Sequence, residues 1–165
     1  MKIKTSDLSG IALDYAVAKC EGYDVVVLTK EEQRARWMEG DVDDDDYDRY
    51  IAPSARPQLR LGENDGYKRR PTHIEAPMLY GKGIPQFEYS TSWAQGGIII
   101  ERERINLVWW HTQCDASYNI GKTASRRISG PTVLVAAMRC YVTAKLGEEV
   151  EIPVELCTEL TIKGD

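Results

Sequence analysis

One apolar segment near the end of the chain constrains the fold more than any other feature. Pro131 opens the segment, and proline suits the first position of a helix because the N–H that it lacks would have no helical partner there. The segment continues to Leu146 with Arg139 as its mid-helix charge, and Gly147 is a natural stop. These features predict a long apolar helix over 131–146. Such a helix must lie at the centre of a domain or pack against a partner chain.

Elements of both types are predicted elsewhere in the chain. Apolar residues at helical spacing from Leu8 predict a helix to about Cys20, which Gly22 ends. β-Branched runs predict strands at 23–29, 98–100, 105–110 and 150–154, with shorter ones at 1–5, 58–61 and 78–80. This irregular order indicates an α+β fold, in which a small antiparallel or mixed sheet packs with the N-terminal helix and the long apolar C-terminal helix. With 165 residues, the chain is expected to form one domain, 1–165.

The part of the chain from Gly40 to about Phe87 shows little pattern and is predicted to be a long irregular middle region. Prolines and glycines recur through it and interrupt helices and strands. Functional loops and a partly disordered insert both explain such a stretch. The acidic run 41–48 predicts a flexible, solvated loop at about 40–50. A calcium loop is excluded, because Asp46 stands where glycine is needed and Ala52 where glutamate is needed.

Composition argues against several classes of protein. The net charge of −5 disfavours general nucleic-acid binding, which requires a basic face. No apolar run approaches the ~20 residues that a membrane span needs. The start of the chain, Met1-Lys2-Ile3-Lys4, leads directly into polar residues and does not resemble a signal peptide. We therefore expect a cytoplasmic protein that binds neither membranes nor specific nucleic acids.

Motifs for catalysis, metals and cofactors are not evident. The four cysteines are far apart and predict reduced, buried thiols. The two histidines, His73 and His111, do not indicate a zinc site. The sequence contains no Ser-His-Asp order, H-E-x-x-H motif or nucleophile elbow. The expectation is a binding protein without catalytic residues, metal or cofactor, rather than an enzyme.

The stretch Y-S-T-S-W-A-Q-G-G, from Tyr89 to Gly97, sets a ring, hydroxyls and an amide directly before two glycines. Two interpretations are open. In one, the glycines turn the chain into a strand and Trp93 belongs to the core. In the other, Gly96 and Gly97 let a ligand approach the backbone, while Trp93 stacks on a planar heterocycle such as a purine. Gln95 and the hydroxyls would then read the edge of that heterocycle.

Basic residues supply a second part of the predicted site. Gly121-Lys122-Thr123 resembles the end of a P-loop, but Ala116 stands where that motif needs glycine, so a nucleoside-triphosphatase is rejected. Arg126 and Arg127 lie just before the predicted C-terminal helix, where guanidinium groups and free N–H groups suit an anion such as phosphate. A solvated basic loop is the alternative.

Three further arginines, Arg102, Arg104 and Arg139, either complete a phosphate site or pair with an acid. Arg139 is the better candidate, because a lone charge on an apolar helix needs a partner. The run 101–104 alternates in charge, so on a strand its acids and arginines would lie on opposite faces. The pair Trp109-Trp110 would likewise place one ring in the core and one against a cavity.

Three parts of the chain resemble one family. The run 8–22 is similar to its N-terminal signature, and 89–103 is similar to its central signature. Gly130-Pro131-Thr132, with 136–142 and 147–150, is similar to its C-terminal helix. The family is the NinX-like proteins of lambdoid phages and prophages. The chain departs from it at Tyr15, where tryptophan is expected, and at Ile98, where proline is common.

The resemblance implies a bacteriophage origin and a setting in the host bacterial cytoplasm. Small accessory phage proteins often counter host defence, and some capture nucleotide immune signals; the extension to this chain is an analogy. The resulting hypothesis is an anti-defence protein that sequesters a cyclic nucleotide or ADP-ribose derivative without chemistry. A homo-oligomer is expected, because the apolar helix offers a contact that would help to build a shared site. The residues predicted to bind the ligand are Tyr89, Ser90, Ser92, Trp93, Gln95, Gly96, Gly97, Arg102, Trp109, Arg126, Arg127 and Arg139.

Two alternative functions stay open. One is an enzyme that cleaves such a nucleotide signal. The other is a protein-interaction module that inhibits or recruits a host factor through the acidic run 41–48, which would mimic a polyanion.

Overall fold

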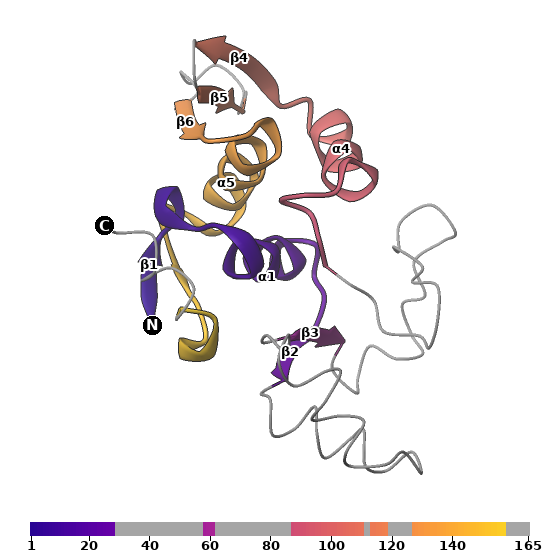
Figure 1. The fold of residues 1–165 in the computed structure, drawn as a ribbon, viewed down its shortest axis with the longest axis vertical. Coiled ribbons are helices and arrows are strands. Elements are labelled where there is room, and N and C mark those ends of the chain that lie inside the picture. Colours follow the sequence, from indigo (N-terminus) through magenta and orange to yellow (C-terminus); the bar gives the residue numbers. More distant parts are fainter. Residues whose placement is uncertain (29–57, 62–86, 111–112, 119–126, 158–165) are drawn as a thin grey trace, which may run out of the picture.

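The computed structural model describes residues 1–28, 58–61, 87–110, 113–118 and 127–157 of the chain. Its helices are α1 (Gly10–Cys20), α4 (Trp93–Arg102) and α5 (Val133–Leu146), with the 3-10 turns η1 (Thr5–Asp7) and η4 (Val154–Leu156). The strands are β1 (Lys2–Lys4), β2 (Val25–Leu28), β3 (Gln58–Leu61), β4 (Asn106–Trp110), β5 (Gln113–Ser117), β6 (Arg127–Gly130) and β7 (Glu149–Glu151). Helices and antiparallel strands follow one another irregularly, so the fold is α+β (Figure 1).

The strands form separate small antiparallel sheets, whereas the sequence led us to expect a single sheet. β4, β5 and β6 form a three-stranded sheet in that order, β2 pairs with β3, and β1 pairs with β7. The β1–β7 pair joins two distant parts of the sequence. The α-amino group of Met1 donates to the carbonyl of Ile152 at 2.7 Å, and the N–H of Thr5 donates to the carbonyl of Glu148 at 2.8 Å.

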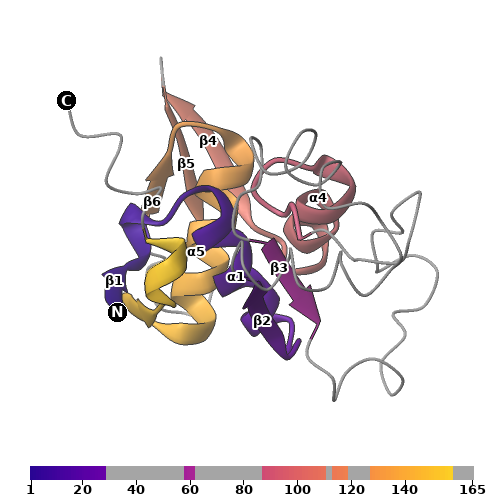
Figure 2. The ribbon, with the colours of Figure 1, turned by 60° about the horizontal axis from the view of Figure 1, so that its bottom comes forward.

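α5 lies at the centre of the described fold. It packs against α1, α4, β5 and β6, and Figures 1 and 2 show it between α1 and the β4–β5–β6 sheet. At the end of β6, a Cβ on Gly130 would lie 2.5 Å from the nitrogen of Ala136, so this glycine lets β6 approach α5 closely. The buried residues of α5 are Leu134, Val135, Ala136, Ala137, Met138, Cys140, Tyr141 and Val142. Because its own chain covers this surface, α5 does not supply the oligomer contact that the sequence indicated.

The first turn of α5 differs from the expectation that Pro131 begins the helix. Thr132 is the N-cap, and its hydroxyl accepts the N–H of Val135 at 3.2 Å. A capping hydroxyl of this kind satisfies an N–H that has no partner inside the helix, so the helix begins after the threonine. At the other end Gly147 has a φ of 98° and terminates the helix.

The run Ile98-Ile99-Ile100 is helical, which corrects the strand predicted there. It lies inside α4, and Ile99 is buried. The preference of β-branched residues for strands is small, and tertiary packing outweighs it here. Gly96 is the residue that permits this packing. A Cβ at position 96 would be 2.3 Å from the carbonyl oxygen of Tyr89, so the glycine lets the helix lie directly against the preceding segment.

The charged run 101–104 does not form a strand either. α4 ends at Arg102, and Arg104 turns the chain toward β4 with a φ of 53°. The predicted separation of acids and arginines onto opposite faces of a strand is therefore wrong. Instead, Arg102 donates from Nε to its neighbour Glu103 at 3.0 Å.

Other predicted strands lie close to their expected positions. β2 falls within 23–29, β3 at 58–61 and β4 within 105–110, whereas Pro153 separates β7 from η4 in the segment predicted as a final strand. The strand predicted at 78–80, the acidic loop at about 40–50 and the rest of the middle region lie outside the described residues. In the described part of the chain no helix is long and apolar enough to cross a membrane.

Candidate functional site

The stretch predicted to surround a ligand forms the approach to α4 and its first turns. Tyr89 is buried with 5% of its surface exposed, and Gln95 with 8%. The side-chain oxygen of Gln95 accepts the backbone N–H of Glu88 at 2.9 Å, so the amide is used inside the protein. Gly96 and Gly97 lie within the helix. Most of this stretch therefore holds α4 against the core.

Ser90 connects the same stretch to α1. Its N–H donates to Asp14 Oδ1 at 2.7 Å, and both residues are buried. Burial raises the pKa of Asp14 to about 7, although the hydrogen bond from the backbone N–H of Ser90 opposes the rise. The carboxyl group is thus a structural acceptor whose charge changes near neutral pH. Ser92, the N-cap of α4, accepts the N–H of Gly96 with its carbonyl oxygen at 2.9 Å.

Trp93 differs from its neighbours because 59% of its surface is exposed. It is the first residue of α4, and a Cβ on Gly97 would lie 3.4 Å from its ring. The ring therefore covers the outer side of the first helical turn and faces solvent. The interpretation of Trp93 as a core residue is wrong. The structure also does not group this ring with the buried side chains of Tyr89 and Gln95 as one open site.

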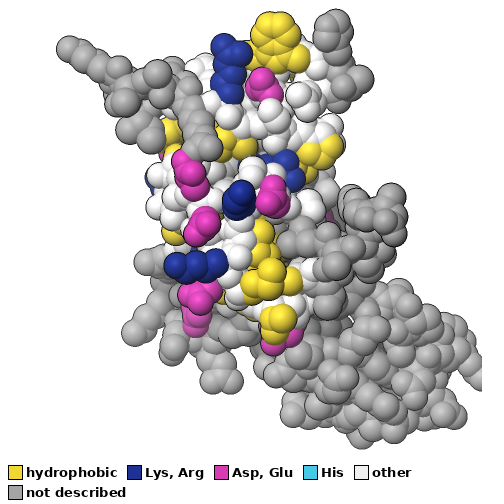
Figure 3. Space-filling view, turned by 90° about the vertical axis from the view of Figure 1, so that its left-hand side faces the viewer, with side chains coloured by type: hydrophobic (Ala, Val, Ile, Leu, Met, Phe, Trp, Pro, Cys, Tyr) yellow, Lys and Arg dark blue, Asp and Glu magenta, His cyan; other side chains and the backbone are white. Residues whose placement is uncertain are grey.

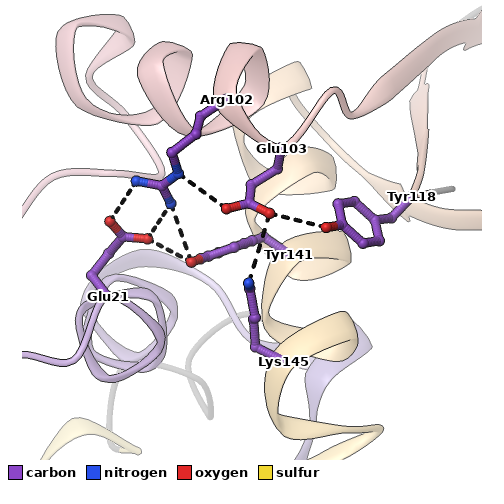
Figure 4. A network of polar contacts seen from close by, with 6 residues as sticks. All are labelled: Glu21, Arg102, Glu103, Tyr118, Tyr141 and Lys145. Atoms are coloured by element: carbon purple, nitrogen blue, oxygen red, sulfur yellow. Dashed lines mark hydrogen bonds and ion pairs between the residues drawn. The ribbon is translucent and has the colours of Figure 1, made fainter. Parts of the chain in front are cut away.

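Arg102 lies in a network of polar side chains that joins α1, α4 and α5 (Figure 4). Its guanidinium group donates to both carboxylate oxygens of Glu21, at 2.9 and 2.6 Å, and to the hydroxyl of Tyr141 at 3.3 Å. The hydrogen bonds to Glu21 raise the pKa of Arg102. Because these bonds and Glu103 occupy all three of its nitrogens, Arg102 is poorly placed to hold a phosphate.

Glu103 extends this network toward the sheet. Its carboxylate accepts the hydroxyl of Tyr118, which follows β5, at 3.0 Å. Lys145 of α5 approaches the same carboxylate at 3.7 Å. Figure 4 shows these groups pointing toward one another from three separate elements. The network connects these elements through hydrogen bonds and ion pairs. The sequence did not indicate it, because its members are far apart in the chain.

Arg139, the lone charge on α5, binds backbone carbonyls. Its Nε donates to the carbonyl of Leu8 at 2.7 Å, and its Nη1 donates to the carbonyl of Ser129 at 3.0 Å. The prediction that this charge needs a partner is confirmed, and its partners within the protein are main-chain oxygens and not an acid. Burial lowers the pKa of Arg139.

Trp109 and Trp110 are both exposed, by 62% and 52% of their surfaces. The expectation that one ring belongs to the core is therefore wrong. The reason is the position of β4 in the sheet: it is an edge strand, since its described partner is β5 alone. α5 contacts β5 and β6, so the rings on β4 extend beyond the part of the sheet that the helix covers.

The β4–β5–β6 sheet has a packed face and an open face. Cys114, Ala116, Ile128 and Gly130 are buried on the face toward α5. Directly opposed residues of an antiparallel ladder share a face, so the pairing defines the open face. It carries three rows: Trp110–Gln113, Val108–Asp115–Ser129 and Asn106–Ser117–Arg127. None of these eight residues is buried.

The open face combines an aromatic ring with several kinds of polar group. Its middle row contains one hydrogen bond, from Ser129 Oγ to Asp115 Oδ1 at 2.6 Å. Arg127, at the far corner from Trp110, is exposed. Arg126, the other predicted anion ligand of this segment, lies outside the described residues. Among the twelve predicted ligand residues, Arg127 therefore belongs to this face, and Trp109 lies on the same strand with its ring toward the opposite side.

The remaining residues of the open face were missed by the sequence analysis. The signal that identifies them is the alternation of polar and small apolar residues in Gln113-Cys114-Asp115-Ala116-Ser117. A period of two is typical of a strand with one buried and one exposed face. The same alternation appears in 127–130, where exposed and buried residues follow in turn.

Within the described residues, neither the cysteines nor the charged side chains form a second candidate site as well defined as the open face. The four cysteines, all within the described residues, form no disulfide, and burial raises the pKa of Cys20 to about 12 and of Cys140 to about 11. In the ranges that the structure describes, no cluster of three potential metal ligands occurs. Figure 3 shows acidic and basic side chains close together on one side of the molecule, without a patch of a single sign.

Comparison with known proteins identifies one family. The family model described as bacteriophage P22 NinX matches residues 4–145 of the chain. No curated protein matches the chain.

Proposed function

We infer that this chain, which belongs to the NinX family of bacteriophage P22, is a phage accessory protein that binds a nucleotide-derived ligand without chemistry. The observation that carries this proposal is the open face of the β4–β5–β6 sheet, where an exposed ring, an amide, hydroxyls and an arginine lie in adjacent rows. The proposed ligand class is a cyclic nucleotide or an ADP-ribose derivative of the host. The proposed setting is the bacterial cytoplasm during infection.

The first row suits a heterocyclic base. Trp110 presents a half-exposed ring, and stacking of a base on such a ring contributes ~1–3 kcal/mol. Gln113 lies directly opposite in the ladder, and cross-strand neighbours have Cβ atoms about 4.5–5.5 Å apart. An amide at this distance both donates and accepts hydrogen bonds, so it is able to read the edge of a base that lies on the ring.

The middle row suits a sugar and not a phosphate. Asp115 is a carboxylate, which accepts hydrogen bonds from ribose hydroxyls. Its negative charge opposes any phosphate placed on this row. Ser129, which already donates to Asp115, keeps acceptor lone pairs for the ligand. The carboxylate therefore orients a nucleotide so that its phosphates point away from the middle of the face.

The third row suits the phosphate. Arg127 is exposed there, and none of the ion pairs within the described residues involves it. Consecutive rows on one face are ~7 Å apart, because strand residues rise about 3.4 Å each and alternate between faces. The ring and the guanidinium group thus lie at opposite ends of a surface with a sugar-binding acid between them. This order matches base, ribose and phosphate in a nucleotide.

A release assay tests the proposal. The purified protein is incubated with a panel of cyclic and linear nucleotides and filtered, and chromatography follows each nucleotide in the flow-through and after heat denaturation of the protein. A nucleotide that disappears and returns intact supports sequestration. A nucleotide that returns altered, at more than one per chain, identifies an enzyme instead. If no nucleotide is depleted, the proposal is wrong.

Matched variants locate the site in the same assay. Trp110→Ala removes the proposed stacking ring and is expected to weaken binding by about 5- to 150-fold, the equivalent of a stacked base. Arg127→Ala is expected to weaken it too, most strongly at low salt. Trp93→Ala is the control, because Trp93 is equally exposed but lies on α4. Loss of binding in Trp93→Ala alone would move the site to α4.

A further inference from the structure

Within the described residues, β4 has a free edge that faces away from β5. The strand order is β4-β5-β6, and no strand of the described chain pairs with β4 on its other side. Natural edge strands are usually protected by charges, prolines or bulges, because their unpaired N–H and C=O groups template pairing with another strand. The sequence of β4, N-L-V-W-W, contains no charge and no proline. This edge therefore lacks the usual protection.

The apolar surface at this edge is large for an isolated strand. Val108, Trp109 and Trp110 are exposed by 43%, 62% and 52%. With up to about 250 Å² for each tryptophan, the two rings alone expose roughly 300 Å². A standard interface buries ~800 Å² on each partner, so the part of this ring surface that lies beside the edge would contribute to one. The backbone edge and the flanking residues lie beside them and add to this area.

We propose that β4 pairs antiparallel with β4 of a second copy of the chain, about a two-fold axis at Val108. Val108 then opposes Val108 of the partner subunit. Leu107 opposes Trp109 of the partner subunit, and Asn106 opposes Trp110 of the partner subunit. Each ring gains a neighbour on its own face of the sheet, because directly opposed residues share a face.

A second copy fits this edge better than a charged partner. The strand offers only backbone groups, apolar side chains and one amide, so its complement must be uncharged and apolar, and β4 itself has that character. A two-fold axis brings the same surface onto itself, which is the commonest form of oligomer contact. The product is one six-stranded sheet in which the open faces of the two copies are continuous. This inference does not rest on the nucleotide ligand.

Sedimentation velocity of the full chain tests the pairing in the absence of any ligand. The 18.6 kDa chain is expected to sediment as a dimer in a concentration-dependent equilibrium. Val108→Lys and Val108→Glu each place like charges opposite one another at the axis, and each is expected to raise the dimer dissociation constant by about 100-fold or more. An equimolar mixture of the two variants is expected to recover the dimer, since opposite charges then face each other.

The control is Val154→Lys, which changes a valine that is more exposed than Val108 (63% against 43%) and lies on η4, away from β4. It is expected to leave the dimer intact. Circular dichroism checks that each variant is folded. A wild-type chain that stays monomeric at its solubility limit overturns the proposal. So does a dimer that Val108→Lys leaves unchanged, or one that the mixture of variants fails to restore.

Discussion

The junction of α1, α4 and α5 and the open face of the sheet contain similar kinds of residue in opposite states. At the junction, Arg102 is fully engaged with Glu21, Glu103 and Tyr141. On the open face, Arg127 forms no ion pair within the described residues, and the ring of Trp110 is half-exposed. The difference shows that residue type alone does not identify a binding site. What distinguishes the two regions is whether the fold has already satisfied each polar group.

If this contrast is correct, substitutions at the junction should lower stability, and substitutions on the open face should not. The largest effect is expected for Gly96→Ala, whose Cβ would lie 2.3 Å from the carbonyl oxygen of Tyr89. Backbone atoms cannot move aside as a flexible side chain does, so the free energy of unfolding should fall by about 3–5 kcal/mol. Urea denaturation measures this loss.

The adjacent glycine supplies the control. A Cβ on Gly97 would lie 3.4 Å from the ring of Trp93, which is ordinary contact. Gly97→Ala should therefore be neutral or stabilise by up to ~1 kcal/mol, because alanine is the better helix former. Equal effects of the two substitutions would show that α4 does not pack against Tyr89 as described.

A smaller effect is expected from the protonation of Asp14 at the junction. The folded protein keeps a proton on this carboxyl up to about pH 7, whereas an unperturbed aspartate releases it at 3.8. The folded state therefore binds more protons between these values, so this group's contribution to stability is complete below pH 3.8 and falls as the pH rises to 7. The loss should amount to about 2–4 kcal/mol.

The Asp14→Asn variant isolates this contribution from those of other acids. Its amide oxygen is still able to accept the N–H of Ser90, but it does not titrate. The difference in unfolding free energy between the variant and the wild type should shift in favour of the variant from pH 4 to pH 7 and then stay level. Chemical denaturation across this range measures it. A difference that is constant with pH would mean that Asp14 ionises at its ordinary pKa.

The smallest changes in stability are expected for Tyr141, whose hydroxyl is hydrogen-bonded, and for Trp110, whose ring is exposed. Tyr141→Phe removes the hydroxyl that donates to Glu21 and should lower stability by about 1 kcal/mol. Trp110→Ala on the open face should change it by less than ~0.5 kcal/mol, as most exposed substitutions do. Thermal unfolding of both variants measures the difference. A larger loss in Trp110→Ala would show that the ring stabilises the fold and is not held ready for a ligand.

Local patterns in the sequence predicted part of this fold. The positions of β2 and β4 follow from β-branched and aromatic runs, and Gly147 marks the end of α5 where a glycine was expected. The helical state of 98–100 could not be predicted, because it depends on the contact between Gly96 and Tyr89. Propensity of the isoleucines indicated a strand, and a tertiary contact outweighed it.

The candidate site was less predictable than the fold. Tyr89 and Gln95 looked available as polar residues beside a ring, but their burial depends on how α4 docks. The residues of the open face come from three strands, and the pairing that aligns Trp110, Asp115 and Arg127 on one surface is a property of the ladder. The alternation along 113–117 could have indicated an exposed face, but not which residues would lie beside one another.

The pairing of β1 with β7 has a consequence for synthesis of the protein. Lys2 lies opposite Glu151 in this ladder, so almost the whole chain separates the two partners. At about 5–20 residues per second, a ribosome adds β7 roughly 7–30 s after β1. During this interval α1 and the β4–β5–β6 sheet are able to form, whereas β1 has no strand to join. Closure of the β1–β7 pair therefore waits until α1 and the three strands of that sheet have been synthesised.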